Sequence, residues 1–238
     1  MSRPSLQVNG VLVVDKQQEW TSHDVCAFLR SRFRIKKVGH AGTLDPLATG
    51  VLVLLLGSAT KLAQTFSSCD KAYFGTLRLG LQTDSQDITG KVLEERDWTG
   101  VSNSSIEEAF QTFLGEIEQI PPMVSALKRD GVRLYKLARA GKTVDRLPRK
   151  VTIQEFRIEA IQLPEIRFYA RVSKGTYLRT LVNDLGERLG TFATLSELRR
   201  VKSGAFSIED ATTIAELKKM EPADLLSRVI DPTAASRV

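Results

Sequence analysis

The feature that most limits how this chain can fold is a run of six apolar residues, Val51 to Leu56, which directly follows a glycine-rich loop. An uninterrupted run of valine and leucine of this length fits a strand that is buried on both faces. The run is far too short to cross a bilayer. We therefore expect a central strand here, in a chain of 238 residues whose composition, 42% hydrophobic and 26% charged, is that of a globular protein.

The other patterns predict strands and helices in mixed order. A short apolar run predicts a buried strand at 11–15, and alternation predicts one at 71–80, with 91–98 as its partner. Further strands are expected at 150–162 and 166–173, and 195–206 leads into a last strand. Apolar spacing predicts helices at 22–33, 58–68, 102–115, 131–141 and 176–189, and Ser104 with Glu107 predicts a capping box. Since strands follow one another in runs, we predict an α+β fold: a mixed, mostly antiparallel sheet flanked by helices, in a single domain spanning 1–238.

The charge of the chain indicates a polyanionic partner. The formal net charge is +6 and the pI is about 9.4. The stretch "RSRFRIKK" (30–37) holds five basic residues and no acid. Between 127 and 150, nine basic residues outnumber Asp130 and Asp145: Lys128, Arg129, Arg133, Lys136, Arg139, Lys142, Arg146, Arg149 and Lys150. Either patch alone is compatible with an ordinary solvated surface, but together with the pI they favour a nucleic acid.

Several common classes of protein are excluded by absent motifs. The chain has neither a phosphate-binding P-loop nor a dinucleotide-binding glycine motif, and "TDSQDITG" (83–90) lacks the spacing of a calcium loop. The two cysteines and two histidines do not have the spacing of zinc ligands, so we expect no metal. No signal peptide or membrane span is present, and we expect a cytoplasmic protein that does not bind membranes.

The loop "VGHAGTLDPLATG" (38–50) contains one acid, Asp45. Pro46 restricts the backbone on both sides of itself, and the three glycines of the loop allow tight turns or the close approach of a ligand. A carboxylate held in this way suits acid–base or covalent chemistry. From the residues alone, an aspartate that only accepts hydrogen bonds from its own loop remains an equal alternative.

The segment "KVGHAGTLDPLATGVL" (37–52) resembles the active-site motif of the bacterial tRNA pseudouridine synthase B (TruB) family, whose members isomerise uridine 55 in the T loop of tRNA. Other blocks of the chain resemble that family in the same order: "VDK…TSHDV" (14–25), "KAYFGTLRLGLQTDSQDITG" (71–90), "QIPPMVSALKRDGVRLYKLARAG" (119–141), "SKGTYLRTLVNDLGERLG" (173–190) and "ELRRVKSGAFSIEDA" (197–211). The resemblance implies the pseudouridine synthase fold and the T arm of tRNA as the partner.

The resemblance also implies roles for individual residues. Asp45 would be the catalytic carboxylate, Tyr73 the aromatic residue that stacks under the flipped uracil and assists catalysis, and Arg179 the arginine that pairs with the carboxylate. Further positions of the substrate-binding site would be Lys16, His40, Tyr177 and Leu198. In the reaction of this family the uracil is detached and bonds again to the ribose through C5, so the resemblance implies no cofactor.

The organisation implied by the resemblance is simple. Residues at about 120–150 would form a basic arm that closes on the RNA, and we expect a monomer that needs no protein partner. The chain ends about where relatives often begin a small C-terminal RNA-binding (PUA) domain, so we expect a catalytic core without that domain.

The chain departs from the family pattern at two places. The usual Lys-Pro-x-Gly turn after the first strand reads "KQQE", with Gln17 and Glu19 in place of Pro and Gly, and Val124 replaces a common aromatic residue. Two alternative functions stay open: a guide-RNA-dependent pseudouridine synthase, and a non-catalytic protein that binds or folds tRNA with the same fold.

Overall fold

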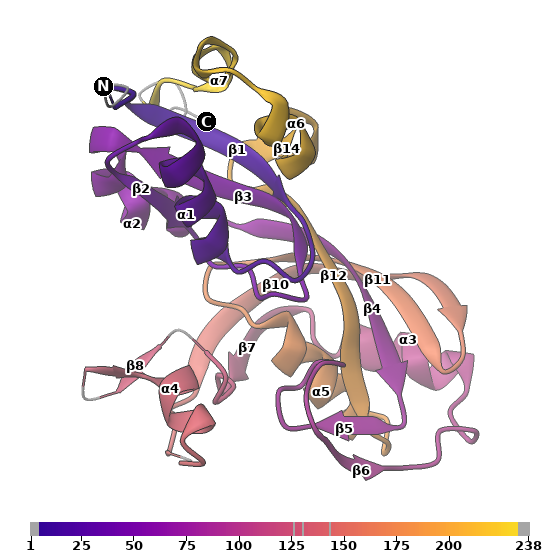
Figure 1. Cartoon of the computed structure of the whole chain (residues 1–238). Helices are drawn as coiled ribbons and strands as arrows, with labels where there is room; N and C mark the ends of the chain where they lie inside the picture. The colour runs from indigo at the N-terminus through magenta and orange to yellow at the C-terminus, as the bar shows by residue number, and fades with distance from the viewer. Residues whose placement is uncertain (1–4, 126, 130, 143, 233–238) are drawn as a thin grey trace. The chain divides into compact units, whose positions relative to one another are not determined.

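The computed structural model describes residues 5–125, 127–129, 131–142 and 144–232 (Figure 1). The chain forms two compact units. One unit runs to Tyr73 and resumes at Arg199, and the other extends from Phe74 to Leu198. Strands β4 (Lys71–Leu79) and β12 (Ala193–Ser203) each contribute residues to both units.

The first unit is built on β3 (Thr49–Leu56), the strand predicted from the apolar run. On one edge β3 pairs with β1 (Gly10–Lys16), antiparallel along the whole length of β1. The other edge is shared by β2 (Val38–Ala41), which is antiparallel, and by β12, which is parallel and sets Arg200 opposite Gly50. Two short strands complete this sheet: β14 (Thr212–Thr213) beside β1, and β13 (Phe206–Ser207) beside β12.

Helices cover this sheet. Helix α1 (Ser22–Phe33) begins at a capping box, in which Thr21 accepts a hydrogen bond from the N–H of Asp24 and Asp24 accepts one from the N–H of Thr21. The remaining elements are η1 (Gly57–Leu62), α2 (Ala63–Ser67), η2 (Ile208–Asp210), α6 (Ile214–Lys219) and α7 (Pro222–Arg228). Figure 1 shows α1 and α2 next to β2, and α6 next to β14.

The second unit carries the strand order β12-β4-β11-β10-β7. Strand β10 (Arg149–Gln162) pairs antiparallel with β11 (Glu165–Val172) and with β7 (Gly115–Gln119). Two small hairpins are β5 (Leu81–Thr83) with β6 (Val92–Glu95), and β8 (Lys128–Arg129) with β9 (Val132–Arg133). The helices are α3 (Asn103–Gln111), α4 (Leu134–Arg139) and α5 (Leu178–Arg188).

Aromatic rings fill the core of the second unit. Phe110 of α3 stacks on Phe156 of β10 with 4.1 Å between ring centroids, and Phe156 meets Phe168 of β11 edge to face at 5.4 Å. Gly75 of β4 faces the Phe168 ring so closely that a Cβ atom at position 75 would overlap it. The glycine in this strand is therefore required by the ring that it faces.

The predicted α+β fold class is confirmed. Helices flank a mixed sheet, and most strand pairs of this sheet are antiparallel. Two local predictions were wrong. Strand β6 pairs with β5 and not with β4, since the chain turns at Gly80, which has a φ of 81°. Helix α3 is capped by Ser102 with Ser105 and not by Ser104 with Glu107. The segment 195–206 lies mostly within β12 itself and then leads into the short strand β13.

A membrane span is not found in the described residues, where every helix is too short or too polar to cross a bilayer.

We predict that Gly75→Ala destabilises the protein by about 1–3 kcal/mol, because the new methyl group forces the Phe168 ring out of its packed position. Urea unfolding followed by circular dichroism measures the change. Gly100→Ala is the matched control, since nothing lies within 4 Å of a Cβ at that position. Equal unfolding free energies for the two variants would show that the ring does not exclude a side chain at 75.

Candidate active site

The loop that carries Asp45 connects β2 to β3. Gly42 and Gly50 stand near its two ends with φ of +96° and +97°, values that only glycine adopts readily. A Cβ at Gly50 would also overlap the main chain of Arg200 on β12. Between the glycines, the N–H of Ala48 donates to the carbonyl of Asp45 at 3.1 Å. Asp45 itself is half-buried.

Ser22 fixes the residue before Asp45. Its hydroxyl is buried in the first turn of α1, accepts a hydrogen bond from the N–H of Leu44 at 2.8 Å and donates to the carbonyl of Leu44 at 3.1 Å. A single side chain thus satisfies both main-chain groups of one loop residue. The sequence analysis did not single out Ser22, although it lies in the block "TSHDV" that resembles the family.

Lys16 fixes the residue after Asp45. Its side chain is fully buried at the end of β1, and its ammonium group donates to the carbonyls of Gln17 at 2.9 Å, Trp20 at 2.6 Å and Pro46 at 3.4 Å. Burial lowers the pKa of Lys16 to about 8, an effect that the negative charge of Asp45 opposes. The geometry therefore makes Lys16 a support of the loop and an electrostatic neighbour of Asp45.

The unusual turn "KQQE" keeps a geometry that serves the same loop. Glu19 adopts a φ of 69°, the left-handed conformation, at the position where the family pattern has glycine. In this conformation its N–H donates to the carbonyl of Pro46 at 2.9 Å. With Glu19 at this position, the turn contacts the loop through its main chain.

The other candidate residues of the first unit lie on strands. His40 is half-buried on β2, opposite Leu54 of β3, and precedes Asp45 by five residues. Tyr73 is buried on β4, with 8% of its surface exposed, whereas the next residue, Phe74, is 43% exposed. The alternation of β4 therefore turns the Tyr73 side chain toward the packed face of the strand.

In the second unit, Arg179 lies in the first turn of α5 and is almost fully buried. Its guanidinium group donates to the carbonyl of Ser85 at 2.6 Å and to that of Val124 at 2.8 Å, and its Nε lies 3.8 Å from a carboxylate oxygen of Asp87. Val124, the second departure from the family pattern, thus contributes its main chain to the position of Arg179.

Asp87 is a functional candidate that the sequence analysis missed. Its other carboxylate oxygen accepts hydrogen bonds from the hydroxyls of Ser85 at 2.8 Å and Thr89 at 2.6 Å, and from the N–H of Thr89 at 3.0 Å. The segment "TDSQDITG" was rejected as a calcium loop and otherwise entered only as part of the block 71–90 that resembles the family. Its order of hydroxyl residues around an aspartate was the available signal for a carboxylate held in place beside a cation.

Tyr177 and Leu198 complete the predicted set in the second unit. Tyr177 is the residue before α5, and both of its main-chain groups bond to the side-chain amide of the buried Gln119, at 2.9 and 3.1 Å. Leu198 lies half-buried on β12. Each unit therefore holds its own share of the predicted residues: Lys16, His40, Asp45 and Tyr73 in the first unit, and Tyr177, Arg179 and Leu198 in the second.

The predicted basic arm contains the β8–β9 hairpin and α4, the short basic helix expected at 131–141. Arg133, Lys136, Lys142 and Arg149 are exposed on it. Arg146 donates to the carbonyl of Pro121 at 3.2 Å, which ties the two ends of the segment together. Asp130 lies outside the described residues.

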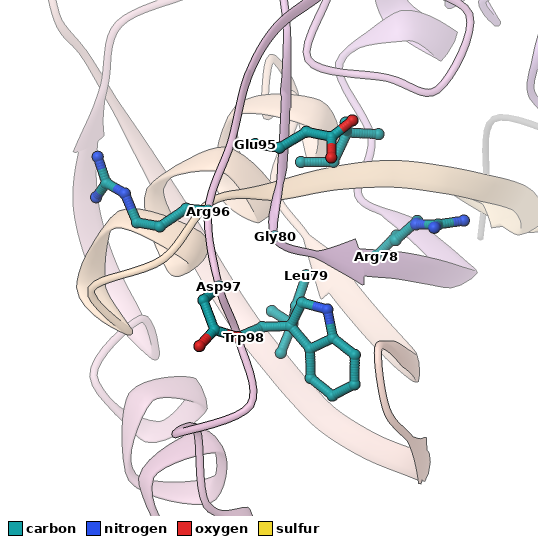
Figure 2. Close-up of a pocket in the computed structure, with 8 residues that line it drawn as sticks. Arg78, Leu79, Gly80, Glu95, Arg96, Asp97 and Trp98 are labelled. Carbon is teal, nitrogen blue, oxygen red and sulfur yellow. The ribbon is translucent and has the colours of Figure 1, made fainter.

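A polar hollow of about 320 Å³ lies elsewhere in the second unit (Figure 2). Arg78, Gly80 and Trp98 are among the residues that line it, together with Glu95 to Asp97, and none of the predicted site residues does. A Cβ at Gly80 would overlap the Trp98 ring, so the glycine makes room for the tryptophan. Within the described ranges, no three His, Cys, Asp or Glu side chains gather closely enough to bind a metal ion.

Comparison with known proteins identifies the class. Residues 30–178 match the family described as "TruB family pseudouridylate synthase (N terminal domain)", and residues 179–236 match "tRNA pseudouridylate synthase B C-terminal domain". The chain belongs to the TruB family of pseudouridylate synthases, as the sequence motifs predicted.

Named relatives agree with this assignment. The chain is 48% identical over 229 residues to tRNA pseudouridine synthase B of Geotalea uraniireducens, covering 96% of this chain and 74% of the relative. It is 44% identical over 230 residues to that of Opitutus terrae, covering 97% and 95%. Among solved structures, the crystal structure of a Cbf5-Nop10-Gar1 complex matches with a TM-score of 0.70 and 31% identity, over 88% of this chain and 54% of that chain.

We predict that Lys16→Met lowers the free energy of unfolding by about 1–3 kcal/mol at pH 7, since three carbonyls lose their shared donor. The difference in unfolding free energy between the native chain and Lys16→Met should widen between pH 8 and about 10. In that window the unfolded chain holds the lysine proton, whose ordinary pKa is 10.5, and the folded chain with its pKa of about 8 does not, so the stability of the native chain rises with pH.

Urea unfolding at a series of pH values measures both effects. The control is Lys219→Met at an exposed position of α6, which should change stability by less than about 0.5 kcal/mol at every pH. A gap that stays constant from pH 7 to 10 would contradict the lowered pKa of Lys16.

Proposed function

We propose that this chain is a tRNA pseudouridine synthase that isomerises uridine 55 of the T loop, with Asp45 as the catalytic carboxylate. The observation that carries the proposal is the support of the Asp45 loop in a chain of this family: Ser22 bonds the residue before Asp45, and Lys16 bonds the residue after it. A carboxylate on main chain held from both sides is preorganised for chemistry.

The reaction is a rearrangement in which atoms balance without any further reactant. The bond between ribose C1′ and uracil N1 breaks, either because Asp45 attacks C1′ or because its charge promotes departure of the base. The detached uracil rotates and forms a bond from C5 to C1′; if Asp45 has attacked C1′, its bond to C1′ breaks in this step and the carboxylate is regenerated. The proton on C5 then leaves, and N1 gains a proton. Neither a metal ion nor an organic cofactor has a part in these steps.

Other side chains have supporting roles in this proposal. In this proposal Arg179 pairs with Asp45. Within its own unit the guanidinium of Arg179 is held by contacts with Ser85, Val124 and Asp87. Tyr73 stacks under the uracil and assists the proton transfer. His40, Tyr177 and Leu198 belong to the substrate site, where His40 contacts RNA displaced by the flipped base. Lys16, predicted for the same site, is fully buried and acts on it by supporting the Asp45 loop.

The RNA partner is recognised through charge and shape. Flipping a base out of the T loop costs a few kcal/mol, which phosphate contacts from the basic arm at 120–150 and from the basic run 30–37 offset. We infer that residues 1–238 form one catalytic domain that works as a monomer, without an obligatory protein partner, in the cytoplasm where tRNA is modified. Identities of 44–48% to tRNA pseudouridine synthases favour tRNA over a guide-RNA-dependent substrate.

We predict that Asp45→Asn slows pseudouridine formation in unmodified tRNA by about a thousandfold or more, because the amide can neither attack the sugar nor stabilise a positive charge on it. Mapping of pseudouridine in the product RNA measures the rate. Asp210→Asn, at an exposed capping position, should keep the native rate within about twofold.

Three results would contradict the proposal in different ways. Equal rates for Asp45→Asn and the native chain would remove Asp45 from the chemistry. Tight binding of tRNA without pseudouridine would favour the non-catalytic alternative. Activity that appears only when a guide RNA is added would favour the guide-dependent class.

A further inference from the structure

Arg200 is a fully buried arginine that none of the roles above includes. It lies on β12, where its main chain pairs with Gly50 at the end of the Asp45 loop. Only 1% of its surface is exposed. Arginine is rarely buried to this extent unless its charge and its five N–H groups are satisfied, so the partners of Arg200 need an explanation.

The partners are main-chain carbonyls around the loop. The Nε of Arg200 donates to Val51 at 2.7 Å, on the β3 side of the loop. Its two terminal nitrogens donate to Gly42 at 3.2 Å and to Thr43 at 3.5 Å, on the β2 side. One planar group therefore joins both arms of the loop, which a lysine ammonium on a single stem does less well.

Two glycines of the loop lie against Arg200. A Cβ at Gly42 would lie 3.6 Å from a terminal nitrogen of Arg200, and a Cβ at Gly50 would overlap the main chain of Arg200. The positive charge of Arg200 also contributes to the lowered pKa of Lys16, so the two buried cations lie near each other under the same loop. Asp45 stands on the loop between the carbonyls that Arg200 and Lys16 hold.

We infer that Arg200 is a positioning residue for the reaction: it holds the loop at 42–43 and 51 so that the Asp45 carboxylate stays in reactive geometry, without itself touching the substrate. This inference rests on the proposed function of Asp45. It implies that loss of the guanidinium reduces the rate of the chemical step far more than the affinity for RNA, because a misplaced catalytic group loses the benefit of preorganisation.

The test is Arg200→Lys, which keeps the charge but not the fork of donors. We expect the single-turnover rate of pseudouridine formation to fall about ten- to a hundredfold, while the Kd for tRNA changes less than about threefold. Arg157→Lys is the matched control, since Arg157 pairs with Glu155 and Glu159 on the exposed face of β10, and it should keep the native rate. The folded fraction of each variant is measured by urea unfolding.

Amide hydrogen exchange gives a second readout that does not depend on activity. Peptides that cover 41–50 should exchange at least about tenfold faster in Arg200→Lys than in the native chain. In Arg157→Lys their exchange rate should be the native one. If Arg200→Lys does not fold, Arg200→Gln, which keeps one NH2 group with two N–H donors but no charge, replaces it in both measurements.

Several results would overturn the inference. These are a native rate in the variant, a loss of rate that matches a loss of tRNA affinity or of folded protein, and unchanged exchange in 41–50. A native chain that makes no pseudouridine would refute the proposed function instead, and the exchange of the loop would then decide the role of Arg200 alone.

Discussion

The carbonyl groups of the loop between β2 and β3 are the constraint on which the candidate site depends. The loop leaves the sheet after Ala41 and returns at Thr49, so its main chain cannot be paired in a strand ladder, and buried carbonyls without donors are costly. Lys16, Ser22 and Arg200 supply these donors from β1, α1 and β12. The position of Asp45 is thus a consequence of how its neighbours in the main chain are satisfied.

The elements that could be predicted are those in which the pattern of apolar side chains indicates which residues are buried. The apolar run 51–56 predicted β3, and the spacing of Val25, Leu29 and Phe33 predicted α1. Strand β12 was hidden because its second half mixes charged residues with apolar ones, and Arg200 in a core does not look like a core residue. The predicted pairing of β6 was wrong because alternation of apolar residues does not show where a chain turns.

The candidate site was predictable to a different extent. Asp45 stood out as one acid in an uncharged loop, and the resemblance to a family supplied roles for Tyr73 and Arg179. The supporting residues left no comparable signal, because every residue has a carbonyl and a sequence cannot show which carbonyl a buried lysine or arginine bonds. Asp87 shows the same limit: its distance from Arg179 is set by folding and not by spacing.

The turn after β1 shows how much variation this kind of support allows. At position 19 the group that holds Pro46 is a main-chain N–H, which every residue except proline can provide. The left-handed conformation costs a residue other than glycine about 1–3 kcal/mol, and the side chain of Glu19 takes no part in the bond. Lys16 lies on β1, two strands from β12 in the sheet. It does not tolerate replacement in the same way, since its side chain is itself the donor. Divergence within this turn is therefore a poor guide to divergence in chemistry: two homologues can differ at 17 and 19 and still present the same carboxylate.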